Sequence, residues 1–205
     1  MALSKIGRSA MQTFYNAEYL SDGEISNFNW AQIGNNVKIH KTCIIANSDK
    51  IFLGSNVRID AFCILSASGE IYIEDYVHIA AGVSILGSGG ARIKNFAGVS
   101  QGVRLVSSTD DFSGEAMTGP LIRPELRKVT SGQIVIGQHV VVGAGTVVLP
   151  GVTIDTGATV GALSLVNKSL APWSIYAGTP AKRIKERKKR PLELQKEFFG
   201  DYPDQ

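Results

Sequence analysis

The sequence predicts an all-β solenoid, a coil of short parallel strands with a triangular cross-section. Two periodicities carry this prediction. Aliphatic residues recur every six positions between residues 136 and 166, and again in triplets spaced by six between residues 33 and 105. A period of six matches neither the alternation of an ordinary strand nor the 3.6-residue turn of a helix. It is typical of a solenoid in which each six-residue unit forms one flat face of the coil.

The later repeat is the strongest signal in the chain and predicts coils of eighteen residues, three faces each. Its aliphatic positions are Ile136, Val142, Val148, Ile154, Val160 and Val166. Small or β-branched residues follow four places after the first five of these, at Val140, Thr146, Val152, Ala158 and Ser164. Residues eighteen apart should therefore stack at the usual strand spacing of about 4.8 Å.

The earlier repeat differs, because its triplets lie twenty residues apart. Each coil is predicted to contain three faces plus two extra residues, always at the same corner. This register stacks Cys43 on Cys63, so we interpret both as reduced core residues rather than as a disulfide or metal pair. The extra residues fall in four polar or glycine-rich segments, which should form a ladder along one corner: residues 46–51, 66–71, 86–91 and 106–111.

The repeats also suggest a division of the chain. Residues 1–30 lack the pattern and are expected to cap the open end of the solenoid, with a helix over residues 4–19 and a turn at Ser21–Gly23. Residues 31–180 form the solenoid domain, interrupted at 106–133 by an inserted loop. Loops of this length usually carry function, and its scattered apolar residues predict an ordered loop packed on another surface.

The last segment, residues 181–205, is predicted to be a helical tail. One helix is expected over Ala181–Arg190 and a second over Pro191–Phe199. The basic run within it has no interleaved aromatics, and the net charge of the whole chain is only +3, so nucleic acid is a weak candidate partner. The N-terminus contains no apolar run long enough for a signal peptide or membrane span, which leads us to expect a cytoplasmic protein.

A family resemblance rests on two stretches, IGQHVVVGAGTVVLPGVTI and VGALSLVNKSLAPWSIYAGTPAKRI. They resemble the hexapeptide-repeat acyltransferases with a left-handed parallel β-helix, in particular the galactoside, maltose, xenobiotic and polysaccharide acetyltransferases. The resemblance implies left-handed coiling, a homotrimer, and acetyl-CoA bound between neighbouring solenoids, with no metal. It also implies acetyl transfer to a hydroxyl or amino group of a sugar or nucleotide-sugar, in surface polysaccharide, lipopolysaccharide or nucleotide-sugar biosynthesis.

The same resemblance assigns the residues expected to bind CoA. Backbone groups around Ala144, Ala162 and Asn167 match positions that line the pantetheine arm, and Lys168 is also expected to bind CoA. Lys182 and Lys185 match positions where relatives place cations against the CoA phosphates, and a pyrophosphate with a 3′-phosphate does require paired cations. Simple corner packing and a solvated basic face would produce the same residues.

The catalytic base is less clear, because relatives carry a histidine at the start of the long loop and this chain has Asp110 there. An exposed aspartate is a weak base, although burial beside Asp111 would raise the pKa of one carboxyl group. An Asx turn without chemistry is the alternative. His78 resembles a histidine that lies near the thioester in nucleotide-sugar N-acetyltransferases, so it is a second candidate. His40 is expected to be a surface residue far from the site, and His139 is expected to be structural.

Two mechanisms and two rival classes stay open at this point. A base assists a sugar hydroxyl in an O-acetyltransferase, whereas a neutral amine attacks directly in an N-acetyltransferase, where positioning supplies most of the rate. The missing loop histidine favours the amine. A γ-type carbonic anhydrase would need His40, His78 and His139 as zinc ligands. A non-catalytic structural solenoid would bind no CoA.

Overall fold

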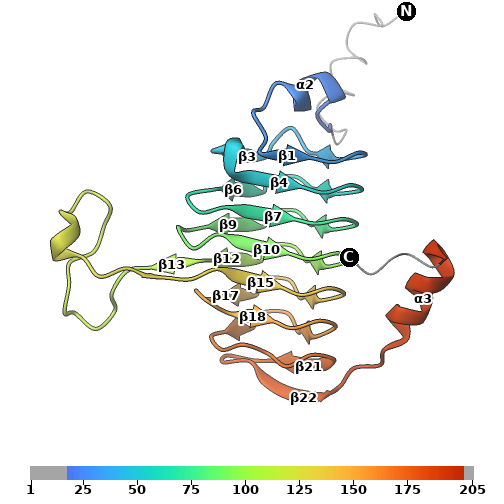
Figure 1. The fold of residues 1–205 in the computed structure, drawn as a ribbon. Coiled ribbons are helices and arrows are strands. Elements are labelled where there is room, and N and C mark those ends of the chain that lie inside the picture. The colour runs from blue at the N-terminus through green and yellow to red at the C-terminus, as the bar shows by residue number, and fades with distance from the viewer. Residues whose placement is uncertain (1–17, 201–205) are drawn as a thin grey trace, which may run out of the picture.

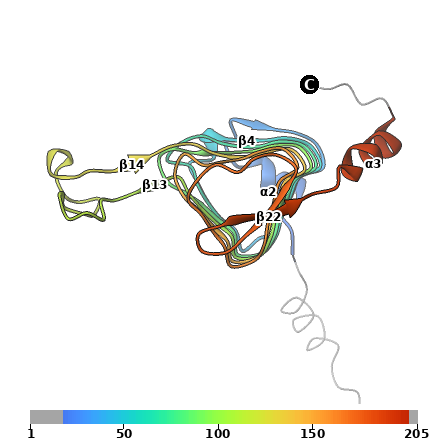
Figure 2. The same ribbon diagram turned by 90° about the horizontal axis from the view of Figure 1, so that it is seen from below.

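The computed structural model describes residues 18–200, and these form a parallel β-solenoid with three flat faces (Figures 1 and 2). Face 1 contains β1 (Gln32–Ile33), β4 (Ile51–Leu53), β7 (Ile71–Ile73), β10 (Ala91–Ile93), β15 (Ile134–Ile136) and β18 (Thr153–Ile154). Face 2 contains β2 (Lys38–Ile39), β5 (Arg58–Ile59), β8 (His78–Ile79), β11 (Gly98–Val99), β16 (Val141–Val142), β19 (Thr159–Val160), β21 (Ser174–Ala177) and β22 (Lys182–Glu186). Face 3 contains β3 (Ile44–Ala46), β6 (Ile64–Ser66), β9 (Ser84–Leu86), β12 (Arg104–Val106), β17 (Val147–Val148) and β20 (Leu165–Val166).

The three corners between these faces are named in chain order. The first corner joins face 1 to face 2, the second joins face 2 to face 3, and the third joins face 3 to face 1 of the next coil. Strand pairing follows the two predicted periods: Ile51 pairs with Ile71, and Val135 pairs with Thr153. The twenty-residue and eighteen-residue coils are therefore both confirmed.

The core is a column of aliphatic side chains inside the prism. All six aliphatic positions of the later repeat are buried, and so are the small residues predicted to fill its corners. Cys63 is buried, Cys43 is half-buried on the neighbouring coil, and both are free thiols. One apolar stripe inside and a polar or small residue at each corner are enough to specify this fold.

The N-terminal segment lies over the first coils. Residues 4–17 of the expected helix lie outside the described residues, while Tyr19 forms a bridge with His40. The predicted turn is instead the start of a short helix, α2 (Asp22–Ser26), because Ser21 and Glu24 form a reciprocal capping box. Leu20 and Trp30 pack against the core at this end.

The inserted loop begins and ends at the third corner, as predicted, and is ordered by its own contacts. Its base is the antiparallel pair β13 (Ser108–Thr109) and β14 (Thr130–Ser131), and it contains a 3₁₀ turn, η2 (Pro124–Leu126). The expectation that it packs on another surface is wrong for the single chain. The loop projects away from the prism (Figures 1 and 2), and Phe112 and Leu121 are 92% and 97% exposed.

The C-terminal tail differs from the predicted pair of helices in its first half. Residues 182–186 are not helical but form β22, which runs antiparallel to β21 and closes the end of face 2. The last coil presents unpaired backbone groups at its edge, and pairing with them outweighs the helical preference of a Lys/Arg-rich segment. The second predicted helix is confirmed as α3 (Arg190–Phe199), which lies beside the first corner (Figure 1). Within residues 18–200, no helix is long and apolar enough to cross a membrane.

Candidate active site

The outer surface of face 2 carries two parallel columns of side chains, because alternate residues of each strand point outward. Backbone hydrogen bonds between successive coils fix the members of each column. The first column is Lys38, Arg58, His78, Gly98, Val141 and Thr159. The second column, which borders the second corner, is His40, Asp60, Ala80, Ser100, Gly143 and Gly161.

His78 is held by a residue that sequence reasoning missed. Its Nε2 lies 2.7 Å from Asp60 Oδ2, while Arg58 and the hydroxyl of Tyr19 bond to Asp60 Oδ1 at 2.7 and 2.8 Å. Partial burial raises the pKa of Asp60, but the hydrogen bonds from His78, Arg58 and Tyr19 outweigh it and hold that pKa at about 2. The twenty-residue register already places Asp60 diagonally beside His78, so the pair could have been found from the sequence.

The second corner brings together two of the predicted CoA-binding residues. Ala144 and Ala162 follow β16 and β19 at this corner, one coil apart, and the backbone oxygen of Ala144 accepts from the N–H of Leu163 at 2.8 Å. Gly143 lies so close to the next coil that a Cβ would meet Ala162 N at 2.5 Å. Small residues are therefore required here for packing, and they also leave the corner open to a thin ligand.

Ser100 lies at the same corner, one coil before Gly143. Its side chain is half-buried, and no hydrogen bond to its hydroxyl is formed within residues 18–200. The sequence pattern does not distinguish this serine, because a serine at a solenoid corner is an ordinary corner residue. Only its position beside Ala144 and Ala162 in space distinguishes it.

Lys182 and Lys185 lie on β22, at the end of face 2. Lys182 pairs with Ala177, and both lysines are exposed. The turn before Lys182 folds back over the second corner, since Ala181 donates its N–H to Leu165 O at 2.8 Å. The second corner thus ends at Lys182, whereas Lys185 sits further along the face.

Asn167 and Lys168 do not join this group. They follow β20 and are exposed at the third corner, across face 3 from Ala162. The third corner is also where the inserted loop begins. One chain therefore divides the predicted CoA-binding residues between two of its corners.

Asp110 and Asp111, at the start of the loop, have different surroundings. Asp111 Oδ2 accepts from the backbone N–H groups of residues 114, 115 and 116, at 2.9, 2.9 and 3.3 Å, and Oδ1 accepts from the Ser113 hydroxyl. The bond from Ser113 and the backbone bonds lower the pKa of Asp111. Asp111 thus forms the predicted Asx-type turn, and its pKa is lowered rather than raised. The carboxylate of Asp110 receives no hydrogen bond within the described residues.

The polar ladder of the third corner satisfies backbone and neighbouring hydroxyl groups. Ser88 N donates to Ser108 Oγ at 3.2 Å, and Ser88 Oγ lies 3.0 Å from Ser131 Oγ. Ser107 Oγ donates to Leu86 O at 3.0 Å. These bonds attach the base of the inserted loop to the coils. The ladder is therefore a structural support for the loop that carries Asp110.

The three histidines do not converge. His40 Nδ1 bonds to Thr42 Oγ1 at 2.9 Å, His78 bonds to Asp60, and His139 Nε2 bonds to Gln195 Oε1 of α3 at 2.6 Å. They lie on face 2 and at the first corner, which does not match a three-histidine zinc site. No group of three or more His, Cys, Asp or Glu side chains between residues 18 and 200 is placed to hold a metal.

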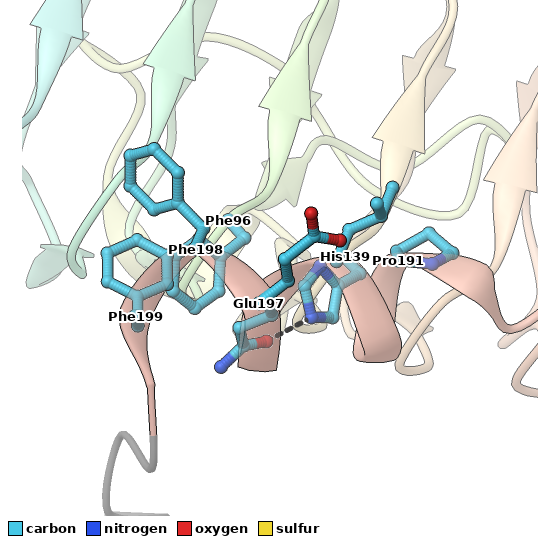
Figure 3. Close-up of a pocket in the computed structure, with 8 residues that line it drawn as sticks. Phe96, His139, Pro191, Glu197, Phe198 and Phe199 are labelled. Atoms are coloured by element: carbon cyan, nitrogen blue, oxygen red, sulfur yellow. Dashed lines mark hydrogen bonds between the residues drawn. The ribbon is translucent and has the colours of Figure 1, made fainter.

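A separate apolar pocket of about 640 Å³ lies between α3 and the first corner (Figure 3). Phe96 and His139 stack there with their ring centroids 5.2 Å apart, and Pro191, Leu194 and Phe198 face them from the helix. Burial lowers the pKa of His139, and the bond to Gln195 only partly opposes this. No residue predicted to bind CoA or to act as base lines this pocket. It serves to dock α3 on the coils.

Known proteins resemble this chain both in the repeat and in the whole fold. The family model described as bacterial transferase hexapeptide (six repeats) matches residues 133–168. A dTDP-4-amino-4,6-dideoxy-D-glucose acyltransferase of Escherichia coli is 40% identical over 94 residues, which span 46% of this chain and 49% of that protein. The alignment thus covers about half of that curated relative. A putative lipopolysaccharide biosynthesis O-acetyl transferase, WbbJ, of Escherichia coli K12 is 36% identical over 72 residues, which span 35% of this chain and 37% of that protein.

Solved structures match over the full length. AntD, an N-acyltransferase from Bacillus cereus, is 38% identical with a TM-score of 0.88, and the match covers 92% of this chain and 100% of that chain. That structure contains dTDP-4-amino-4,6-dideoxyglucose and coenzyme A. A galactoside acetyltransferase, at 22% identity and a TM-score of 0.58, shares the fold. The chain therefore belongs to the hexapeptide-repeat acyltransferases.

Proposed function

We propose that this protein is an N-acyltransferase that moves an acyl group from a CoA thioester to the amine of a nucleotide-linked 4-amino-4,6-dideoxyhexose. The observation that carries the proposal is one serine–aspartate pair. AntD has been solved as variants at a serine and at an aspartate ten residues further along its chain, with dTDP, dTDP-4-amino-4,6-dideoxyglucose and CoA bound among them. In the present sequence, Ser100 and Asp110 are the only serine and aspartate with that order and spacing.

The surroundings of both residues support this assignment. The hydroxyl of Ser100 and the carboxylate of Asp110 have no hydrogen-bond partner in the described part of the chain, so both are available to substrates. Asp111, in contrast, is committed to the loop. We assign Asp110 as the base and Asp111 as the residue that positions it.

The placement of the two residues argues for an oligomer. Ser100 is at the second corner and Asp110 at the third, with the width of face 3 between them. Apolar side chains are exposed on face 3 and beside it, at Ile44, Phe62, Leu86 and Leu163. If three copies direct face 3 toward a common axis, the second corner of each copy meets the third corner of its neighbour. A homotrimer would thereby bring Ser100 of one copy to Asp110 of the next.

The same arrangement gives the divided CoA-binding residues a common location. CoA would lie along the second corner past Ala162 and Ala144, with its phosphates at Lys182 and Lys185 and its thioester at Ser100. Asn167 and Lys168 would reach it from the third corner of the neighbouring copy. The cations then lie at one end of the groove, where the charge of CoA is concentrated.

Acyl transfer to an amine does not need a strong base. The sugar nitrogen attacks the thioester carbonyl, a C–N bond forms, and the C–S bond breaks to release the CoA thiolate. The hydroxyl of Ser100 donates a hydrogen bond to the developing negative charge. Asp110 accepts a proton from the nitrogen as its positive charge develops, and the proton then passes to the thiolate. Positioning of the amine against the thioester supplies most of the rate.

The amine is favoured over a hydroxyl acceptor because no histidine occupies the start of the loop, where Asp110 stands. A sugar hydroxyl needs a stronger base than an aspartate. His78 remains the alternative base. The acyl group is less constrained, since the relatives include acetyltransferases and AntD has also been solved with 3-hydroxybutyryl-CoA. We place the reaction in the cytoplasm, in the assembly of surface polysaccharide or lipopolysaccharide.

The test is a thiol-release assay with acetyl-CoA and 3-hydroxybutyryl-CoA against a panel of acceptors. The panel contains dTDP-4-amino-4,6-dideoxyglucose, a UDP-linked amino sugar and a neutral glycan. The proposal predicts rapid release with the dTDP-amino sugar and an amide product by mass spectrometry. Turnover of the neutral glycan alone would identify an O-acyltransferase. Absence of CoA binding by calorimetry would instead leave a structural solenoid.

A further inference from the structure

The surface around Ser100 is formed by small residues. Ala80 and Gly143 lie on the coils before and after it in the second column, and Gly98 precedes it on the same coil. A Cβ added to Gly98 would meet no atom within 4 Å, so the space above it is open. Ala80 is only 4% exposed and therefore forms a recessed floor.

This open space is bounded on its N-terminal side by His78 and Asp60. His78 precedes Gly98 by one coil in the first column, and Asp60 precedes Ala80 by one coil in the second. The imidazole is half exposed and is fixed through Nε2 by the 2.7 Å contact with Asp60 Oδ2. Within residues 18–200, its Nδ1 makes no hydrogen bond, which leaves one polar atom of a fixed ring available.

If CoA binds as in the function proposed above, the direction of its groove determines which part of the thioester meets the His78–Asp60 pair. From Lys182 to Ser100 the groove runs toward the N-terminal coils. The acyl group continues beyond the thioester in the same direction, over Ala80 and then against the His78–Asp60 pair. Successive coils are about 4.8 Å apart. A four-carbon acyl chain spans about one coil, so it ends beside His78, and a longer chain would collide with it.

We propose that the His78–Asp60 pair closes the acyl end of the groove and selects short acyl groups that carry a hydrogen-bonding substituent at the third carbon. An apolar chain end placed against this pair displaces water from the polar groups of His78 and Asp60. The hydrogen bonds that the water made are then not replaced, and this loss is unfavourable. A 3-hydroxyl replaces one of those bonds at His78. We therefore expect 3-hydroxybutyryl-CoA to bind more tightly than butyryl-CoA, and hexanoyl-CoA not to bind.

Calorimetry with acetyl-CoA, butyryl-CoA, 3-hydroxybutyryl-CoA and hexanoyl-CoA tests this without any acceptor. In the wild type, 3-hydroxybutyryl-CoA should bind roughly tenfold more tightly than butyryl-CoA, as one hydrogen bond allows. His78→Phe keeps the bulk of the ring and should abolish this difference while still excluding hexanoyl-CoA. His78→Ala should admit hexanoyl-CoA. Ala80→Val should weaken four-carbon thioesters about tenfold and leave acetyl-CoA unchanged.

Lys38→Ala is the matched control, because Lys38 stands in the same column two coils before His78. It should leave the donor profile as in the wild type. If free CoA and the thioesters bind but both His78 variants keep the wild-type profile, the acyl assignment is overturned and the proposed function stands. If neither CoA nor any thioester binds the folded wild type, both proposals fall.

Discussion

Asp110 and Asp111 are consecutive residues, yet only Asp111 has its carboxylate bonded to the loop, through three backbone N–H groups and the Ser113 hydroxyl. The hydrogen-bond partners therefore distinguish a carboxylate that is free within the described residues from a structural one. Asp110 is free to meet a substrate, and Asp111 holds the segment that presents it.

Replacing Asp110 by Asn should lower kcat with the amino-sugar acceptor by roughly 10²–10⁴, the range for loss of a general base. CoA affinity should not change, because Asp110 is proposed to act on the sugar amine and not to contact CoA. Steady-state kinetics and calorimetry measure the two quantities. Asp111→Ala is the comparison: it should accelerate hydrogen exchange at residues 114–116, which Asp110→Asn leaves as in the wild type. Wild-type kcat in Asp110→Asn would disprove the base assignment.

Lys182→Ala and Lys185→Ala should each raise KM for acyl-CoA about tenfold, since each removes one cation from the CoA phosphates. Dephospho-CoA thioesters, which lack the 3′-phosphate, should be affected less by whichever lysine contacts that group. Increasing salt should reduce the difference in KM between each variant and the wild type, because salt screens the attraction between lysine and phosphate. Lys38→Ala again provides the control. Equal KM values for the variants and the wild type would place the CoA phosphates elsewhere.

Gly69→Ala should reduce the free energy of unfolding by about 1–3 kcal/mol, through overpacking against a neighbouring coil. A Cβ at Gly69 would lie 2.3 Å from Ser88 O and 2.6 Å from Gly90 N, both of them backbone atoms. Gly98→Ala is the control for stability, because its Cβ would meet nothing within 4 Å. Urea unfolding of both variants tests the prediction, which fails if they are equally stable.

The docking of α3 should weaken as the pH falls below about 6.5, the ordinary pKa of histidine. Burial lowers the pKa of His139 in the docked state, so protonation is easier when the helix is released. The stabilisation is therefore complete above pH 6.5 and is lost as the pH falls toward the lowered pKa. Protection factors of residues 190–199, which are exchange rates relative to the intrinsic rate at each pH, measure this at pH 7.5 and 5.5.

His139→Asn is the control for that experiment. Asn tolerates the left-handed backbone found at His139, where φ is 57°, and does not titrate in this range. The protection factors of α3 in this variant should lose their dependence on pH. An unchanged pH dependence in His139→Asn would assign the effect to another group.

The limits of sequence reading are clearest in the C-terminal tail. A run of lysine and arginine around Ile184 favours a helix locally, and nothing in its composition indicates a strand. It becomes β22 because the last strand of face 2, β21, offers unpaired backbone groups that only the folded solenoid creates. Local preference is a weak term beside a row of backbone hydrogen bonds.

The proposed active site shows the same limit of reading structure from sequence. The loop start at Asp110 was found from the sequence, because the interruption of a strict repeat is visible in one dimension. Ser100 was not found, since one serine among the corner residues has no distinguishing pattern. Its position beside Ala144 and Ala162 depends on stacking coils of twenty and eighteen residues across the inserted loop.

The sequence by itself determined the solenoid, the two coil lengths, the site of the inserted loop and the stacking of Cys43 on Cys63. Each of these follows from a repeat whose period fixes which residues point inward. Only the tertiary structure decided which carboxylate of Asp110 and Asp111 is free and that Ser100 shares a corner with the predicted CoA-binding alanines. The partners of a loop carboxylate and the stacking of coils across an inserted loop arise from three-dimensional contacts, which the periodicity of a single chain does not specify.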